Sequence, residues 1–146
     1  HDAVNMKDKY TKEFKEYLKK YLNKFINDLY ANEYERTIEW HSLEKEEHEK
    51  DNGQTVCDMD IDVKYLRFTL NVYPQAFKIY KEDKHEFQEI LLHECCHLLT
   101  EPMYIIQVDL SNGENIHRNT IETVREQQTQ RITNALMNLY RNNISL

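Results

Sequence analysis

Hydrophobic residues recur at steps of three and four positions near the start of the chain, between residues 10 and 29. This spacing places them along one side of a helix, and most of the intervening lysines fall on the other side. An aromatic-rich stripe of this kind is typical of a packing surface. The pattern therefore predicts a long N-terminal helix whose core-facing residues are Tyr10, Phe14, Tyr17, Leu18, Tyr21, Leu22, Phe25, Ile26 and Leu29.

The pattern changes to one typical of strands in the middle of the chain. Residues 36–43 are rich in β-branched and aromatic side chains, and residues 55–63 partly alternate, so each segment predicts a strand. The clearest alternation is in residues 65–73, and Pro74 is expected to end that strand. One face of this strand should hold Leu66, Phe68, Leu70 and Val72, and the other Tyr65, Arg67, Thr69, Asn71 and Tyr73.

Two more helices are predicted in the second half of the chain. The first covers residues 84–100 and is expected to end at Glu101, because a residue that precedes proline avoids the α region. The second runs from about residue 115 to about residue 140, with Ile121, Val124, Ile132, Ala135 and Leu139 on its apolar face. The order helix, small sheet, helix, loop, helix predicts an α+β fold in one domain spanning residues 1–146.

Composition excludes several classes of function. The 146 residues include 19 Lys plus Arg and 26 Asp plus Glu, for a net charge of −7, which argues against a nucleic-acid partner. The chain has only two glycines, too few for a loop that cradles phosphate groups. No apolar run approaches the roughly 20 residues that span a bilayer, so no membrane partner is expected.

The cysteines and the first residues bear on the expected location. Cys57, Cys95 and Cys96 are odd in number and two are adjacent, which argues against a disulfide framework. The first nine residues lack the apolar segment of a signal peptide. We therefore expect a cytoplasmic protein. Met6 is a candidate start residue, which would leave residues 1–5 outside the natural chain.

The predicted helix 84–100 contains the motif His93-Glu94-Cys95-Cys96-His97. Two histidines four positions apart project from one face of a helix, and their nitrogens can reach one tetrahedral metal ion at about 2.0–2.1 Å. Glu94 is about 100° around the helix from His93, where a carboxylate can act as general base on an attacking water. Two histidines and a glutamate inside an apolar helix need partners, and a metal ion supplies one.

Zinc is the expected cofactor, because it suits two histidines and a carboxylate with one open position; manganese and iron are compatible with the same ligand types. The third ligand must come from elsewhere in the chain. We favour Glu126 on the last helix, since it begins the part of that helix in which apolar residues recur most regularly. Glu122 and His117 are the alternatives. Cys95 and Cys96 are expected to be buried fillers of the core.

At these residues the sequence resembles a zincin of the glutamate-ligand type, and more narrowly the short metallopeptidases ascribed to phages and prophages. The resemblance spans about residues 36–140. It rests on a strand ending at Pro74, on the histidine motif, and on the last helix with Glu126, Thr129, Ile132, Ala135 and Leu136 in register. The two cysteines inside the motif depart from the family pattern.

The resemblance implies a minimal zincin-like fold in which a long helix backs a small mixed sheet of about three strands. It implies that His93, His97 and Glu126 hold zinc and that Glu94 is the catalytic base of a metallopeptidase acting on a peptide or protein. It assigns no residue to the oxyanion, for which Tyr104 and His117 are candidates. The alternative hypothesis is a catalytically silent zincin-like module that regulates another protein by binding it; a three-histidine nuclease is disfavoured by the missing third histidine.

Overall fold

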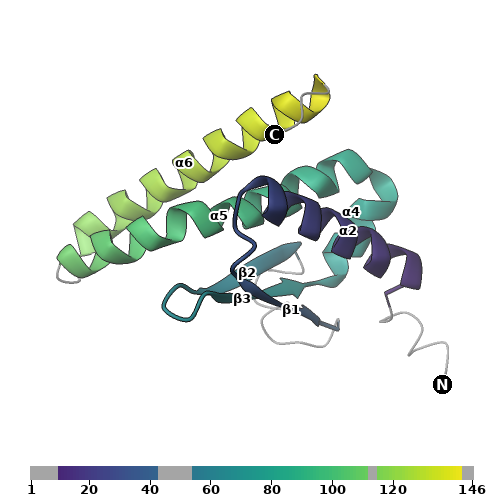
Figure 1. Ribbon diagram of the computed structural model, residues 1–146, viewed down its shortest axis with the longest axis horizontal. Coiled ribbons are helices and arrows are strands. Elements are labelled where there is room, and N and C mark those ends of the chain that lie inside the picture. Colours follow the sequence, from purple (N-terminus) through teal and green to yellow (C-terminus); the bar gives the residue numbers. More distant parts are fainter. Residues whose placement is uncertain (1–9, 43–53, 112–114, 143–146) are drawn as a thin grey trace.

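The computed structural model describes residues 10–42, 54–111 and 115–142. It has an α+β fold, as the sequence predicted, with four helices and a three-stranded mixed sheet in the described residues. Figure 1 shows α2, α5 and α6 on one side of the sheet, with α6 lying along α5 and farthest from the strands. In the order of the chain the elements are α2 (Lys12–Asp28), β1 (Glu35–Trp40), β2 (Cys57–Asp62), β3 (Arg67–Val72), α4 (Pro74–Glu82), α5 (Lys84–Leu110) and α6 (Asn115–Arg141).

The N-terminal helix is confirmed as a packing element. Thr11 caps α2 by accepting a hydrogen bond from the backbone N–H of Phe14, which satisfies one of the free donors at a helix start. The buried residues on α2 are members of the predicted stripe: Phe14, Leu18, Leu22, Phe25 and Ile26.

In the described ranges, no helix combines the length and apolarity needed to cross a bilayer.

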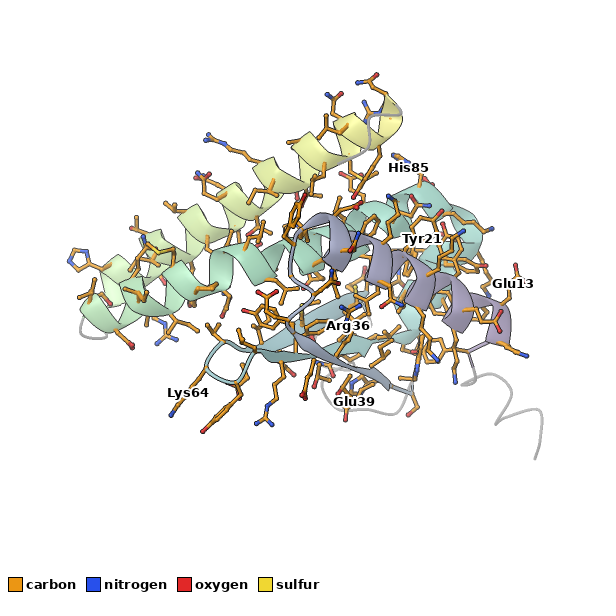
Figure 2. All side chains as sticks on the ribbon, viewed as in Figure 1. Glu13, Tyr21, Arg36, Glu39, Lys64 and His85 are labelled. Atoms are coloured by element: carbon orange, nitrogen blue, oxygen red, sulfur yellow. The ribbon has the colours of Figure 1, made fainter. Side chains whose placement is uncertain are left out.

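The sheet has the strand order β1-β3-β2, with β3 parallel to β1 and antiparallel to β2. Strand β3 is therefore central, and β2 is the edge strand that contacts α5. Arg36 on β1 faces α2, where its guanidinium donates to Asn23 Oδ1 at 2.6 Å. Figure 2 shows Glu39 on the opposite side of the sheet and Lys64 at the tip of the β2–β3 hairpin.

The predicted strand at residues 65–73 is longer than the observed β3, which covers Arg67–Val72. Leu66 lies in the hairpin turn, with φ 50° and 42% of its surface exposed. Asn71 and Tyr73, which were predicted to face away from Leu70 and Val72, are both buried. Asn71 is tolerated there because it is fully hydrogen-bonded: its oxygen contacts His41 Nε2 at 2.9 Å, and its amide donates to Asp58 and Asp60.

The predicted end of the second helix at Glu101 is also wrong, because α5 continues through Pro102 to Leu110. Proline removes one backbone hydrogen bond and crowds the preceding turn. Contacts with α6 on both sides of Pro102 offset this cost: Thr100 Oγ1 lies 2.9 Å from Thr129 Oγ1, and the Tyr104 hydroxyl donates to Glu122. Tertiary packing therefore overrides the local signal.

Helix α4 was not predicted. Pro74 ends β3 as expected, but it also occupies the first turn of α4, where its fixed φ suits a helix start. Asp83 then separates the helices and caps α5 by accepting from the N–H of Glu86 at 3.1 Å. This cap fixes where α5 begins and therefore the angular position of the residues that follow.

We predict that Phe14→Ala lowers the free energy of unfolding by about 3–5 kcal/mol, the usual effect of truncating a buried phenylalanine. Phe14 is fully buried, and its ring centroid lies 4.8–5.9 Å from those of Trp40, Phe77, Tyr80 and Phe87. Urea unfolding measures the effect. Lys12→Ala, on the exposed face of the same helix, is the control and should change stability by no more than about 0.5 kcal/mol. Equal effects for the two variants would contradict this core.

Candidate metal centre

The core-facing side of α5 determines where the histidine motif points. Leu91, Leu92, Cys95 and Cys96 are fully buried and Leu98 nearly so, so this side of the helix is fixed against the core. His93, Glu94 and His97 lie on the remaining side, toward α6 and the edge strand β2. Both cysteines of the motif are core fillers with free thiols, as expected, and burial raises the pKa of Cys96 to about 11.

Helix α6 is held against α5 by buried threonines. Thr129 and Thr133 are fully buried, and each hydroxyl donates to a backbone carbonyl one turn earlier, Arg125 O and Thr129 O respectively, at 2.8 Å. The hydroxyls are thus satisfied within α6 and can lie in the interface at little cost. This packing places Glu126 and Gln130, which flank Thr129, beside the histidine motif.

Glu126 lies against both histidines of the motif. Its Oε2 is 3.2 Å from His93 Nε2, and its Oε1 is 3.3 Å from His97 Nε2. The two imidazole rings are nearly perpendicular, at 84°, with centroids 5.1 Å apart. The structure therefore brings together the three residues that the sequence selected as metal ligands; their binding of a metal remains a prediction.

The other proposed third ligands have different surroundings. Glu122 accepts a hydrogen bond from the Tyr104 hydroxyl at 2.9 Å and lies 3.5 Å from the Arg118 guanidinium. His117 is on an exposed turn of α6, nine positions before Glu126 and hence about 13 Å away along the helix axis. Of the three candidates, Glu126 is the one whose carboxylate reaches the imidazoles.

The other nitrogen of each imidazole is oriented by α6. His93 Nδ1 lies 2.9 Å from the Gln130 side-chain oxygen, and the Gln130 amide nitrogen donates to Asn134. His97 Nδ1 lies 3.5 Å from the Thr129 hydroxyl oxygen, whose proton is already donated to Arg125 O. Both partners can act as acceptors, an arrangement that favours the tautomer protonated at Nδ1 in a neutral ring.

This tautomer leaves a lone pair on each Nε2 facing a carboxylate oxygen at 3.2 and 3.3 Å. Two acceptors at that separation repel unless a proton or a cation lies between them. Burial lowers the pKa of His97 to about 4, although the charge of Glu126 opposes the shift, so this imidazole is neutral at pH 7. The donor set therefore fits a divalent cation bound by His93, His97 and Glu126.

Glu94 lies beside these groups in a poorly hydrated position. Burial raises the pKa of its carboxyl to about 8; the nearby carboxylates of Asp58 and Glu126 add to the shift, and Arg125 opposes it. One oxygen of Glu94 lies within 4.8 Å of a ligand atom of both His93 and His97. Such a strongly shifted acid beside potential metal ligands is typical of a functional site.

An open pocket of about 260 Å³ gives access to this group from the side of β2. Its lining includes three residues that sequence reasoning did not select, Asp58, Glu101 and Arg125. Asp58 was missed because its position depends on strand pairing: it lies on β2 and is held by the Asn71 amide of β3 at 2.8 Å. Arg125 precedes Glu126 in the chain, but nothing in the helical periodicity distinguishes it from a surface arginine.

Comparison of the chain with protein-family models, with curated proteins and with solved structures gives no match. The site is therefore interpreted from the geometry and chemistry of its own residues.

We predict that Glu94→Gln stabilises the metal-free protein at pH 8 by about 2–4 kcal/mol but at pH 5.5 by only about 1 kcal/mol. Folding raises the pKa of this carboxyl from 4.5 to about 8, so between these pH values the folded protein binds more protons than the unfolded chain. The free energy of unfolding therefore falls as the pH rises through this range. Urea unfolding in the presence of a chelator at both pH values measures the difference. A Glu94→Gln effect that does not depend on pH would contradict the buried, protonated carboxyl.

Proposed function

We propose that the protein is a zinc-dependent hydrolase, and specifically a metallopeptidase, in which His93, His97 and Glu126 hold the metal ion. The observation that carries this proposal is the approach of two imidazole Nε2 atoms to the oxygens of one carboxylate at 3.2 and 3.3 Å. Ligands that surround a tetrahedral zinc ion at 2.0–2.1 Å are separated from one another by about 3.3–3.4 Å. The two nitrogen–oxygen distances to Glu126 are close to this spacing.

The hydrogen bonds of the imidazoles also support a metal site. In metal centres a ligating histidine usually donates its other N–H to a carbonyl, carboxylate or water, which fixes the tautomer and the orientation of the ring. Gln130 and Thr129 are in position to do this for His93 and His97. Both come from the same helix as Glu126, so a single element provides one ligand and orients the other two.

When bound in such a site, zinc lowers the pKa of water toward neutrality and polarises a carbonyl group. Glu94 is the residue that moves the proton: its carboxylate accepts a proton from the attacking water and delivers it to the leaving nitrogen. Positive charge nearby favours the ionised carboxylate, so a bound dication lowers the pKa of Glu94 from its metal-free value of about 8. The open pocket beside β2 would admit the peptide.

The metal site predicts the zinc content of variants. Zinc-replete wild-type protein should bind one zinc ion after removal of excess metal, and His97→Ala and Glu126→Ala should bind substantially less. Glu122→Ala is the matched control, because Glu122 lies one turn from Glu126 on the same helix but contacts Tyr104. Elemental analysis measures the content. Loss of zinc in Glu122→Ala with retention in Glu126→Ala would assign the third ligand to Glu122.

The role of Glu94 predicts that binding and catalysis separate. Glu94→Gln should retain zinc, because an amide of the same shape replaces a residue outside the ligand set. It should lower the rate of hydrolysis of a fluorescence-quenched random peptide library by about 10²–10⁴-fold, the usual contribution of a general base. Turnover equal to that of the wild type would exclude this role for Glu94.

A further inference from the structure

Arg125 is the basic side chain in a pocket otherwise rich in carboxylates. It lines the same cavity as Glu94, His97 and Glu126, and it is the only Lys or Arg among the described residues that line it. Arg125 lies next to Glu126 in the chain, and its Nη1 extends to Glu101 on α5. Its guanidinium therefore forms a wall of the pocket.

Two contacts from α5 hold this guanidinium in place. Arg125 Nη1 donates to Glu101 Oε2 at 3.0 Å, and the guanidinium carbon lies 3.9 Å from the centre of the Tyr104 ring. Stacking on an aromatic face together with a carboxylate contact restricts the plane of a guanidinium. The Tyr104 hydroxyl is already used, since it donates to Glu122. Tyr104, a candidate for the oxyanion from sequence, therefore orients Arg125.

These contacts do not use all the donors of Arg125. A guanidinium carries five N–H groups, and Nη2 lies 3.6 Å from Glu126 Oε1, too far for a good hydrogen bond. Nε is buried without a hydrogen-bond partner in the described part of the chain, so solvent and ligands cannot reach it. Nη2 is thus the nitrogen that is both oriented and available, beside the carboxylate that contacts the two histidines.

We propose that Arg125 is a catalytic residue that donates from Nη2 to the substrate carbonyl oxygen as that oxygen gains negative charge; this inference rests on the proposed peptidase function. When water adds to the carbonyl carbon, a C–O bond forms, the π electron pair moves to the carbonyl oxygen, and Glu94 takes the proton. The C–N bond then breaks, the electron pair returns to restore the carbonyl, and the proton passes to the nitrogen. Arg125 stabilises the negative oxygen between these steps and is itself unchanged.

Binding of an anionic tetrahedral probe tests this role without a known substrate. Isothermal titration of the zinc-loaded protein with methylphosphonate, which is tetrahedral and anionic, is compared with imidazole, a neutral zinc ligand. Arg125→Met should weaken methylphosphonate binding by about tenfold or more, the size expected for loss of one charged donor, and leave imidazole affinity and zinc content unchanged. Arg125→Lys should recover part of the loss, because it restores the charge but not the planar group.

Arg131→Met is the matched control, since Arg131 lies on α6, is exposed and does not line this pocket; it should bind both probes as the wild type does. Equal methylphosphonate affinity in Arg125→Met and wild-type protein would overturn the proposal, as would loss of zinc from Arg125→Met, which would make Arg125 structural. Failure of the wild-type protein to bind zinc would instead overturn the proposed function and this inference with it.

Discussion

The packing of α6 against α5 at the buried Thr129 is the contact on which the site depends. The histidine motif by itself presents two imidazoles on one face of α5, but neither has a partner on that helix. Thr129 lies 2.9 Å from Thr100 and 3.5 Å from His97 Nδ1, so one small residue both sets the helix separation and orients a ring. A larger side chain at this fully buried position would separate the helices and withdraw Glu126 and Gln130 together. The geometry of the site is therefore a consequence of helix packing.

The sequence predicted the parts of the fold and site that depend on regular spacing within one element. The i, i+4 spacing of His93 and His97 and the apolar stripe on α2 follow from helical geometry alone, and the structure places both as expected. Glu126 was selected from the recurrence of apolar residues along α6. This is a weaker signal, because it does not distinguish one exposed glutamate from another. The α5–α6 pairing distinguished it from Glu122, and a single sequence does not contain that pairing.

The errors have the same origin. Pro102 is a correct local signal for a helix end, but contacts to α6 on both sides of it continue the helix. The burial of Asn71, which the alternation did not reveal, is possible because His41, just after β1, and Asp58 on β2 supply its hydrogen-bond partners. In contrast, α4 could have been predicted from the sequence. It has a proline in its first turn, Pro74, and two buried residues four positions apart, Ala76 and Tyr80. The helix was missed because Pro74 was interpreted only as the end of the strand. Pairing between elements, rather than propensity, decided the other cases.

The charges around the pocket bear on the proposed metal centre. Asp58, Glu101 and Glu126 bring three carboxylates to the pocket and Arg125 one positive charge. Because the pKa of Glu94 is near 8, its carboxyl is mostly protonated at neutral pH and adds no fourth negative charge. The three carboxylates and the guanidinium then have a net charge of about −2. A dication neutralises that charge and favours ionisation of Glu94, the form that can accept a proton. The low pKa of His97 acts in the same direction, because it keeps a lone pair available. Burial of the Glu94 carboxyl thus opposes folding without a metal ion, and in the proposed site the charge of a bound ion would offset this cost.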